Sequence, residues 1–198
     1  MSSEQYSPKG KILILTAPSG AGKTTVVRHL MKYFPQLGFS VSATTRPPRP
    51  GEIHGQDYYF LDAEDFTQKI ENGDFVEYEE VYPGRFYGTL RSEVERIWSK
   101  GQAIVFDIEV KGATNIKRLY PQNSLAVFVS PPTKEVLFER LRNRSTEDEA
   151  SLQARFDRSA EELSYANSFD RVLVNDLLSD CLAEAEVLTA NFLGLPLE

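Results

Sequence analysis

The stretch Ala17-Pro-Ser-Gly-Ala-Gly-Lys-Thr24 decides the fold of this chain. An apolar run, Ile12-Leu-Ile-Leu15, precedes it and has the length of a buried strand, while residues 26–31 read as a helix. A glycine-rich turn between a strand and a helix, closed by Gly-Lys-Thr, is the context of a phosphate-binding loop. We therefore predict that free N–H groups at the helix start bind phosphate oxygens.

The composition of this loop suits a nucleoside triphosphate. Gly20 and Gly22 let the backbone turn and approach a ligand without a Cβ, although Ala17 stands where such loops usually begin with glycine. Lys23 supplies a charge for the β- and γ-phosphates, and the Thr24 hydroxyl suits Mg²⁺. The loop residues predicted to bind the triphosphate, which the family resemblance described below implies to be ATP, are Ala17, Pro18, Ser19, Gly20, Ala21, Gly22, Lys23, Thr24 and Thr25.

The composition limits the classes of protein to which this chain can belong. The 198 residues are 41% hydrophobic, which predicts one compact unit with a real core. A net charge of −7 argues against non-specific nucleic-acid binding, and no apolar run approaches the roughly 20 residues of a membrane span. Cys181 is the one cysteine, so no internal disulfide forms. These features, with a polar segment at residues 1–9 that lacks a signal-peptide pattern, predict a cytoplasmic protein.

Buried strands alternate with helices along much of the chain. This alternation predicts an α/β fold with a parallel sheet that is flanked by helices. The strands predicted for this sheet are 12–15, 103–106, 125–129 and 172–174, and the helices are 26–31, 93–100, 133–142, 147–165 and one from 178 to about 193. Residues 39–89 read as a small mixed insertion, with strands at 39–42, 58–61 and 75–81, a helix at 62–71 and a proline-rich irregular segment at 43–51.

A carboxylate follows the strand at 103–106. Asp107 at the end of a parallel strand is expected beside the phosphate loop, where it would hold Mg²⁺ together with Thr24. Glu109 lies two residues further on, and it points in the same direction if the strand continues. A surface role for Glu109 remains an alternative.

Arginines gather in two places. Arg46 and Arg49 lie in the proline-rich segment, where stiff guanidinium forks suit a phosphate monoester, and Tyr58 and Tyr87 would add hydroxyl donors. The second group spans two predicted helices, which suggests a lid that closes on triphosphate; ion pairs within the helices are the alternative. Its members are Arg140, Arg142, Arg144, Arg155 and Arg158.

Several motifs together resemble the guanylate kinase family over about residues 11–193. The motifs are Ala17–Thr24, Ser40-Val-Ser-Ala-Thr-Thr-Arg-Pro-Pro-Arg49, Gly55-Gln-Asp-Tyr-Tyr-Phe60, Phe75-Val-Glu77, Tyr87-Gly-Thr89, Asp107-Ile-Glu109, Gly112, the arginines near 140–155 and Val174-Asn-Asp176. The resemblance implies transfer of a phosphoryl group from ATP to GMP, with Mg²⁺ as cofactor. It also implies a phosphate-loop fold with a GMP-binding insertion and a helical lid.

The resemblance assigns roles to individual residues. Ser42, Glu77 and Thr89 would read the guanine edge. Asn175 would lie near adenine. The implied GMP-binding residues are Ser42, Arg46, Arg49, Tyr58, Glu77, Tyr87, Thr89, Asp107 and Glu109, the last standing where Asp is frequent; the implied catalytic residues are Lys23, Arg140, Arg144 and Arg155.

The expected organisation is a single domain, 1–198. Its core would comprise residues 1–38, 90–133 and 159–198, the GMP-binding insertion residues 39–89 and the lid residues 134–158. We expect ATP and GMP as partners, and a monomer or homodimer. Two alternatives are a kinase for another nucleotide or phosphorylated sugar, and a binding module for phosphorylated peptides. The intact Lys23 and Thr24 argue against the module.

Overall fold

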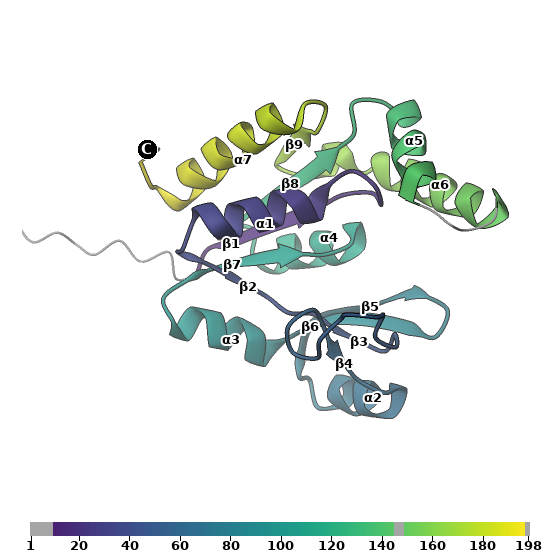
Figure 1. Cartoon of the computed structure of the whole chain (residues 1–198). Coiled ribbons are helices and arrows are strands. Elements are labelled where there is room, and N and C mark those ends of the chain that lie inside the picture. Colours follow the sequence, from purple (N-terminus) through teal and green to yellow (C-terminus); the bar gives the residue numbers. More distant parts are fainter. Residues whose placement is uncertain (1–9, 145–148, 197–198) are drawn as a thin grey trace, which may run out of the picture.

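A computed structural model describes residues 10–144 and 149–196. Within these ranges the framework is a parallel sheet of five strands in the order β2-β7-β1-β8-β9, with helices on both faces (Figure 1). The fold class predicted from the sequence is thus confirmed. The elements of this layer are β1 (Ile12–Thr16), α1 (Lys23–Tyr33), β2 (Leu37–Phe39), α3 (Arg91–Ser99), β7 (Ala103–Asp107), α4 (Val110–Leu119), β8 (Ser124–Ser130), β9 (Arg171–Val174) and α7 (Leu178–Leu193), with a short 3-10 turn at Ala166–Ser168.

The central strand β1 is buried on both faces, which explains its unbroken apolar sequence. Leu13 and Leu15 pack with α1 and α7 on one face, whereas Ile12 and Ile14 pack with α3 and α4 on the other. Because β1, β7 and β8 run parallel, with Leu15 beside Asp107, their carboxyl ends meet at one edge. Ligands of open α/β sheets bind at this kind of edge.

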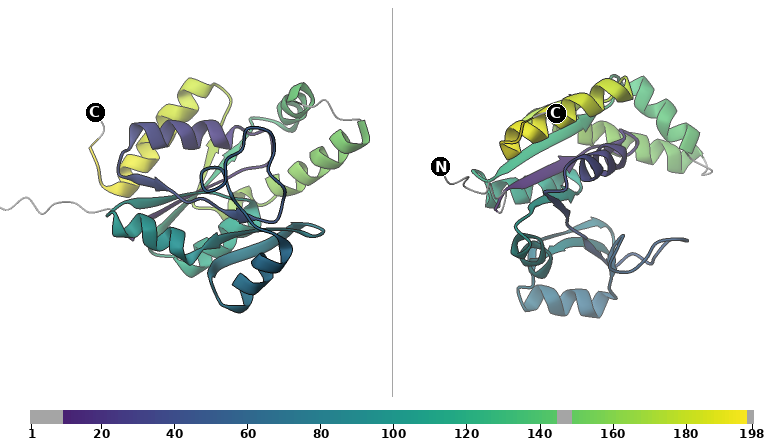
Figure 2. Two further views of the ribbon diagram at one scale, coloured as in Figure 1. Left: turned by 60° about the horizontal axis from the view of Figure 1, so that its bottom comes forward. Right: turned by 60° about the vertical axis from the view of Figure 1, so that its left-hand side comes forward.

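A second, smaller sheet lies apart from the first, with α2 on its outer side (Figure 2, right). Among the described residues its strand order is β4-β3-β6-β5, and Phe66 of α2 packs on Phe75 of β5 with ring centroids 4.5 Å apart. Asp62 caps α2, because its side chain accepts the Asp65 N–H at 2.7 Å. The elements are β3 (Ala43–Thr44), β4 (Tyr59–Phe60), α2 (Ala63–Glu71), β5 (Phe75–Tyr82) and β6 (Arg85–Leu90).

Two helices, α5 (Lys134–Arg144) and α6 (Glu149–Leu163), form a third part beyond the carboxyl edge of the parallel sheet (Figure 1). Leu137, Leu141 and Leu152 are buried between them. α6 continues without a break past residue 158, where the sequence analysis ends the lid. None of the helices in residues 10–144 and 149–196 has the length and apolarity to cross a membrane.

The structure differs from the predicted elements in four places. The strand expected at 39–42 lies earlier, at Leu37–Phe39, because it pairs with Ala103–Val105 of β7. Ala43 and Thr44 form a strand inside the segment predicted as irregular, because they precede its prolines. β6 and α4 were not predicted. The strand before Glu109 ends at Asp107, so Glu109 instead occupies the N-cap position of α4.

Candidate functional site

The phosphate loop has the predicted geometry. Gly20 and Gly22 adopt φ angles of +88° and +97°, a left-handed conformation that side chains disfavour. Gly22 is the N-cap of α1, so the first N–H groups of the helix face the loop. A Cβ on Gly22 would lie 2.3 Å from Asn175 Nδ2, and this amide donates to the Ala21 carbonyl at 2.8 Å. Asn175 therefore holds the backbone of the loop in place through its side-chain amide.

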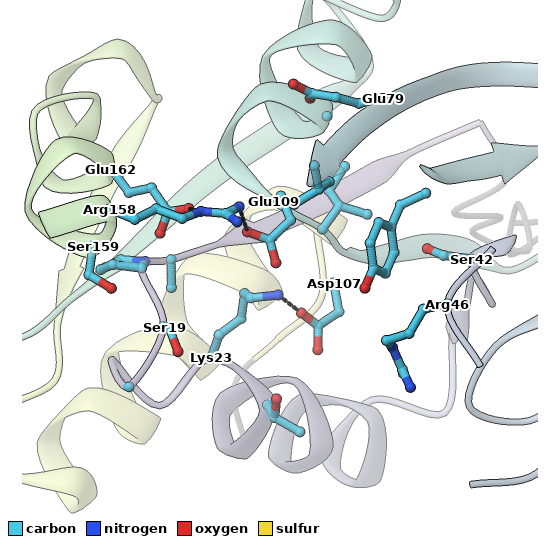
Figure 3. A pocket seen from close by; sticks show the side chains of 18 of the residues that line it. Ser19, Lys23, Ser42, Arg46, Glu79, Asp107, Glu109, Arg158, Ser159 and Glu162 are labelled. Carbon is cyan, nitrogen blue, oxygen red and sulfur yellow. Dashed lines mark hydrogen bonds and ion pairs between the residues drawn. The ribbon is translucent and has the colours of Figure 1, made fainter. Parts of the chain in front are cut away.

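A cavity of about 720 Å³, called the central cavity below, opens between this loop, the smaller sheet and α6 (Figure 3). It brings together residues from all three parts of the chain. Most of the predicted site residues line it, namely Ala17, Pro18, Ser19, Gly20, Gly22, Lys23, Thr24, Thr25, Ser42, Arg46, Arg49, Tyr58, Glu77, Tyr87, Asp107, Glu109 and Arg155. Residues that line it without having been assigned to the site are Glu79, Val81, Arg85, Gly88, Ile108, Gly112, Arg158, Ser159 and Glu162.

An ion pair between Lys23 and Asp107 occupies the middle of the cavity (Figure 3). Both side chains are mostly buried, at 17% and 15% exposure. Burial lowers the pKa of Lys23, whereas the carboxylates of Glu109 and Glu162 oppose this shift. Lys23 is thus held where a phosphate would be more strongly attracted than in water, because the surroundings screen charge poorly.

Glu77 and Thr89 form a cross-strand pair at the end of the cavity nearest the smaller sheet. They are register partners on β5 and β6, and the Thr89 hydroxyl donates to Glu77 Oε1 at 2.7 Å. Thr89 is buried and does not line the cavity, so it acts on Glu77. Glu77 is only 9% exposed, and burial raises the pKa of its carboxyl group while the bond from Thr89 opposes the rise. This pair presents an oriented acceptor to the cavity.

Arg46 is held by a carboxylate that the sequence analysis missed. Its Nη1 and Nη2 donate to the two oxygens of Glu52, each at 2.8 Å, and Glu52 also accepts the backbone N–H of Arg49 at 2.6 Å. The Glu52 hydrogen bonds raise the pKa of Arg46 and Arg46 lowers that of Glu52. The guanidinium carbon lies 5.1 Å from the Tyr58 ring centre, so cation–π attraction adds to the fixation.

One face of α6 points into the cavity. Arg155, Arg158, Ser159 and Glu162 recur at helical spacing, and all four line the cavity. Arg155 Nη2 donates to Ser19 Oγ at 3.2 Å. Arg158 lies between Glu109, at 3.3 Å, and Glu162, at 3.0 Å, as Figure 3 shows. The sequence analysis had placed Arg158 in the second arginine group, and the same helical spacing, counted from Arg155, is the signal that would have found Glu162.

Arg140 and Asn175 lie elsewhere. They line a second cavity of about 380 Å³ on the far side of Gly20 and Gly22, together with Thr25, Asn143, Asp176 and Leu178. Arg140 Nη2 donates to the Asn175 carbonyl at 2.9 Å. Ala21 is buried and lines neither cavity. The Arg144 side chain lies outside those that the structure describes.

Comparison with known proteins places the chain in a family. A model of the family described as guanylate kinase matches residues 9–190. The chain belongs to the guanylate kinase family. It is 49% identical to the guanylate kinase of Salinibacter ruber over 187 residues, 94% of this chain and 99% of that one. It is 44% identical to the guanylate kinase of Chlorobium luteolum over 191 residues, 96% of each chain.

A solved structure extends the similarity to the fold. The crystal structure of guanylate kinase from Anaplasma phagocytophilum superposes with a TM-score of 0.72 at 30% identity, covering 94% of this chain and 88% of that chain. The resemblance to the guanylate kinase family that the sequence motifs indicated is thus confirmed.

Proposed function

We propose that this chain, as a guanylate kinase, transfers the terminal phosphoryl group of ATP to GMP in the central cavity, giving ADP and GDP. The observation that carries the proposal is that one cavity joins the phosphate loop to Glu77, a buried carboxylate oriented by Thr89. The reaction is reversible and belongs to purine nucleotide metabolism, in which it recycles GMP. We expect it in the cytoplasm, from a monomer or homodimer.

GMP is proposed to bind at the end of the cavity next to the smaller sheet. Glu77, oriented by Thr89, would accept from the N1–H and 2-amino groups of guanine, with Ser42 beside it. Arg46 and Arg49 would hold the phosphate from a segment that Glu52 stiffens. Tyr58 and Tyr87, whose rings lie 6.0 Å apart, would add hydroxyl donors. Asp107 and Glu109 would close the side of this site that faces the parallel sheet.

ATP is proposed to lie across the phosphate loop, with adenine towards the second cavity near Asn175. Mg²⁺ would be held by Thr24 and Asp107, which both line the central cavity and supply oxygen ligands. No cluster of three or more acidic, His or Cys side chains that could hold a metal occurs among the described residues. Few protein ligands suit Mg²⁺ carried by a nucleotide, because phosphates and water complete its coordination.

The chain's own residues would act by positioning and by charge. No protein nucleophile is proposed, because in-line transfer needs alignment of donor and acceptor. Lys23 would leave Asp107 for the ATP phosphates, while Arg155 and the predicted Arg140 and Arg144 would approach from the lid. Bound Mg²⁺ would further neutralise charge on the phosphate oxygens. Burial of the cavity would exclude water and so limit hydrolysis of ATP.

A coupled assay of ATP consumption tests the proposal. With Mg²⁺ present, ADP release should require GMP, and it should be at least about 10³-fold slower with AMP or with a phosphorylated sugar, because a site built to bond one base rejects another. Equal rates with AMP would favour a kinase for a different substrate. Absence of turnover, together with binding of a phosphorylated peptide, would favour the binding module.

Replacement of Arg46 by alanine should raise KM for GMP at least about 10-fold and leave KM for ATP within about 2-fold. The reason is that one charge-assisted contact to the monophosphate is lost, whereas the phosphate loop is untouched. Steady-state kinetics with each nucleotide varied gives both values. Since Glu52 loses its partner, Arg46→Ala/Glu52→Gln serves as a second variant, and Lys69→Ala is a control on α2. Equal rises in both KM values would place Arg46 at a shared phosphate.

The GMP-binding insertion and the lid should both move when the nucleotides bind. We expect residues 39–89 and about 134–158 to swing towards the phosphate loop while the parallel sheet stays fixed, because transfer requires exclusion of water. Small-angle scattering with and without ATP analogue plus GMP measures the change, and a smaller radius of gyration is expected with both ligands. An unchanged profile would contradict the assignment of these segments as mobile units.

A further inference from the structure

We propose that Gly112 determines specificity for guanine, because the absence of a side chain at this position of α4 leaves room for the Glu77 carboxylate. The inference rests on the proposed function and concerns a residue to which the sequence analysis assigned no role. Gly112 is buried in the first turn of α4 and lines the central cavity. It belongs to the parallel-sheet layer, whereas Glu77 belongs to the smaller sheet, so the contact joins the two layers.

Glycine is needed at position 112 because it lacks a Cβ, and not because of its backbone conformation. Gly112 is absent from the glycines with positive φ, and a helical backbone accommodates alanine better than glycine. A Cβ on Gly112, however, would lie 3.2 Å from Glu77 Oε2 and 3.7 Å from Glu77 Cδ. The first distance is tighter than the 3.4–4 Å of ordinary van der Waals contact. The helix thus carries a residue that is unfavourable for a helix where the acidic side chain approaches.

Glu77 has little freedom to retreat from an added methyl group. Its Oε1 accepts the Thr89 hydroxyl at 2.7 Å, and a Cβ on Gly88 would lie 2.9 Å from its backbone oxygen, so the neighbouring strand packs closely. β5 is tied to α4 a second time, because Lys111 Nζ lies 3.1 Å from Glu79 Oε1. A side chain at position 112 must therefore displace the Glu77 carboxylate, or the smaller sheet with it.

Displacement of the Glu77 carboxylate would affect both of its oxygens, which base recognition needs. Oε1 is engaged by Thr89, and Oε2 lies over Gly112, at the boundary with the cavity. A carboxylate that accepts from both N1–H and the 2-amino group of guanine requires both oxygens in line with the base edge. A shift of a few tenths of an ångström weakens such paired bonds. Inosine monophosphate, which lacks only the 2-amino group, has less to lose from the shift.

Gly112→Ala tests the inference. We expect kcat/KM for GMP to fall at least about 10-fold, KM for ATP to stay within about 2-fold, and the ratio of GMP to inosine monophosphate to decrease, because misplacement of a binding group lowers productive alignment. Thermal unfolding should show an equal or higher Tm, since alanine favours the helix. Thr114→Ala is the matched control, because Thr114 is exposed on the same helix and its change also favours the helix. It should leave kcat/KM for GMP, KM for ATP and the ratio of GMP to inosine monophosphate unaltered.

A double-mutant cycle tests direct contact. Glu77→Asp withdraws the carboxylate by one methylene, which should lower kcat/KM for GMP in the native background. In the Gly112→Ala background the same change also relieves the steric conflict. The combined loss should then be at least about 5-fold smaller than the product of the two single losses, because contacting residues are not additive. Losses that multiply fully would overturn the contact argument.

Other outcomes of these experiments also decide whether the inference holds. An unchanged ratio of GMP to inosine monophosphate in Gly112→Ala would overturn the inference, as would a lower Tm with equal rises in both KM values, which would indicate packing alone. Calorimetric titration with GMP and no ATP separates the inference from the proposed function. If the unsubstituted chain binds GMP without phosphorylating it, the proposed function fails, while the GMP affinities of the two proteins still decide the role of Gly112.

Discussion

Replacement of Lys23 by methionine is expected to lower kcat at least about 100-fold, a loss of about 2.7 kcal/mol of transition-state stabilisation. The structure supplies the reason, because Lys23 reaches the middle of the central cavity and pairs there with Asp107. In this buried setting one fixed positive charge interacts strongly with a phosphoryl group that gathers negative charge. Methionine preserves most of the side-chain length and apolar surface, so the change removes mainly charge.

The measurement is steady-state turnover at saturating ATP and GMP, with circular dichroism to verify the fold. KM for GMP should change little, since GMP is assigned to the end of the cavity next to the smaller sheet. Lys32→Met is the matched control, because Lys32 is an exposed lysine in the last turn of the same helix. Its turnover should equal that of the unsubstituted protein. Near-normal kcat in a folded Lys23→Met variant would remove the assignment of Lys23 to the transferred phosphoryl group.

A second variant tests whether loss of the resting ion pair destabilises the fold. Lys23→Met leaves Asp107 without this partner, and a mostly buried carboxylate without a partner destabilises the fold. Lys23→Met/Asp107→Asn removes both charges, and it is a test of stability alone because Asp107 is itself proposed to hold Mg²⁺. A higher Tm in the double variant than in Lys23→Met would show that the unpaired carboxylate causes the loss of stability.

The parts of the site that the sequence predicted were found from different kinds of signal. Gly20 and Gly22 are required by a left-handed backbone within a few residues of Lys23, so pattern and geometry coincide. Asp107 was placed by strand order alone, because parallel strands end at one edge. The position of Glu77 and Thr89 came from family motifs, and their pairing depends on strand β6, which the sequence analysis did not predict.

The parts that were missed depend on contacts between distant segments. α4 contains Gly112 and Thr114, which lower helix propensity, and its N-cap Glu109 makes no side-chain capping bond. Packing of Ala113 and Ile116 against the sheet stabilises the helix instead. Arg158 reaches Glu109 across 49 positions of sequence, so no local pattern indicates that contact. Glu52 is the exception, because it lies only six positions from Arg46, in an irregular stretch where no repeat indicates which side chains meet.

The second large effect concerns the choice of base. Replacement of Glu77 by glutamine should lower kcat/KM for GMP at least about 100-fold, with no decrease for AMP, because a buried site that loses a matched acceptor discriminates strongly. Guanine offers two donors, N1–H and the 2-amino group, to a carboxylate that only accepts. Glutamine keeps the size and the acceptor for Thr89, but it presents an amide donor that meets N1–H unfavourably and adenine N1 favourably.

The comparison of GMP with AMP in both proteins measures this effect, and Glu80→Gln on the same strand is the control, because Glu80 is exposed and does not line the cavity. A pH series adds an independent readout. Burial raises the pKa of Glu77, so the protonated fraction grows as the pH falls through that raised value, and a protonated carboxyl accepts less well. KM for GMP should therefore rise towards acid pH in the native protein and less so in Glu77→Gln. Retained preference for GMP in Glu77→Gln would show that another group reads the guanine edge.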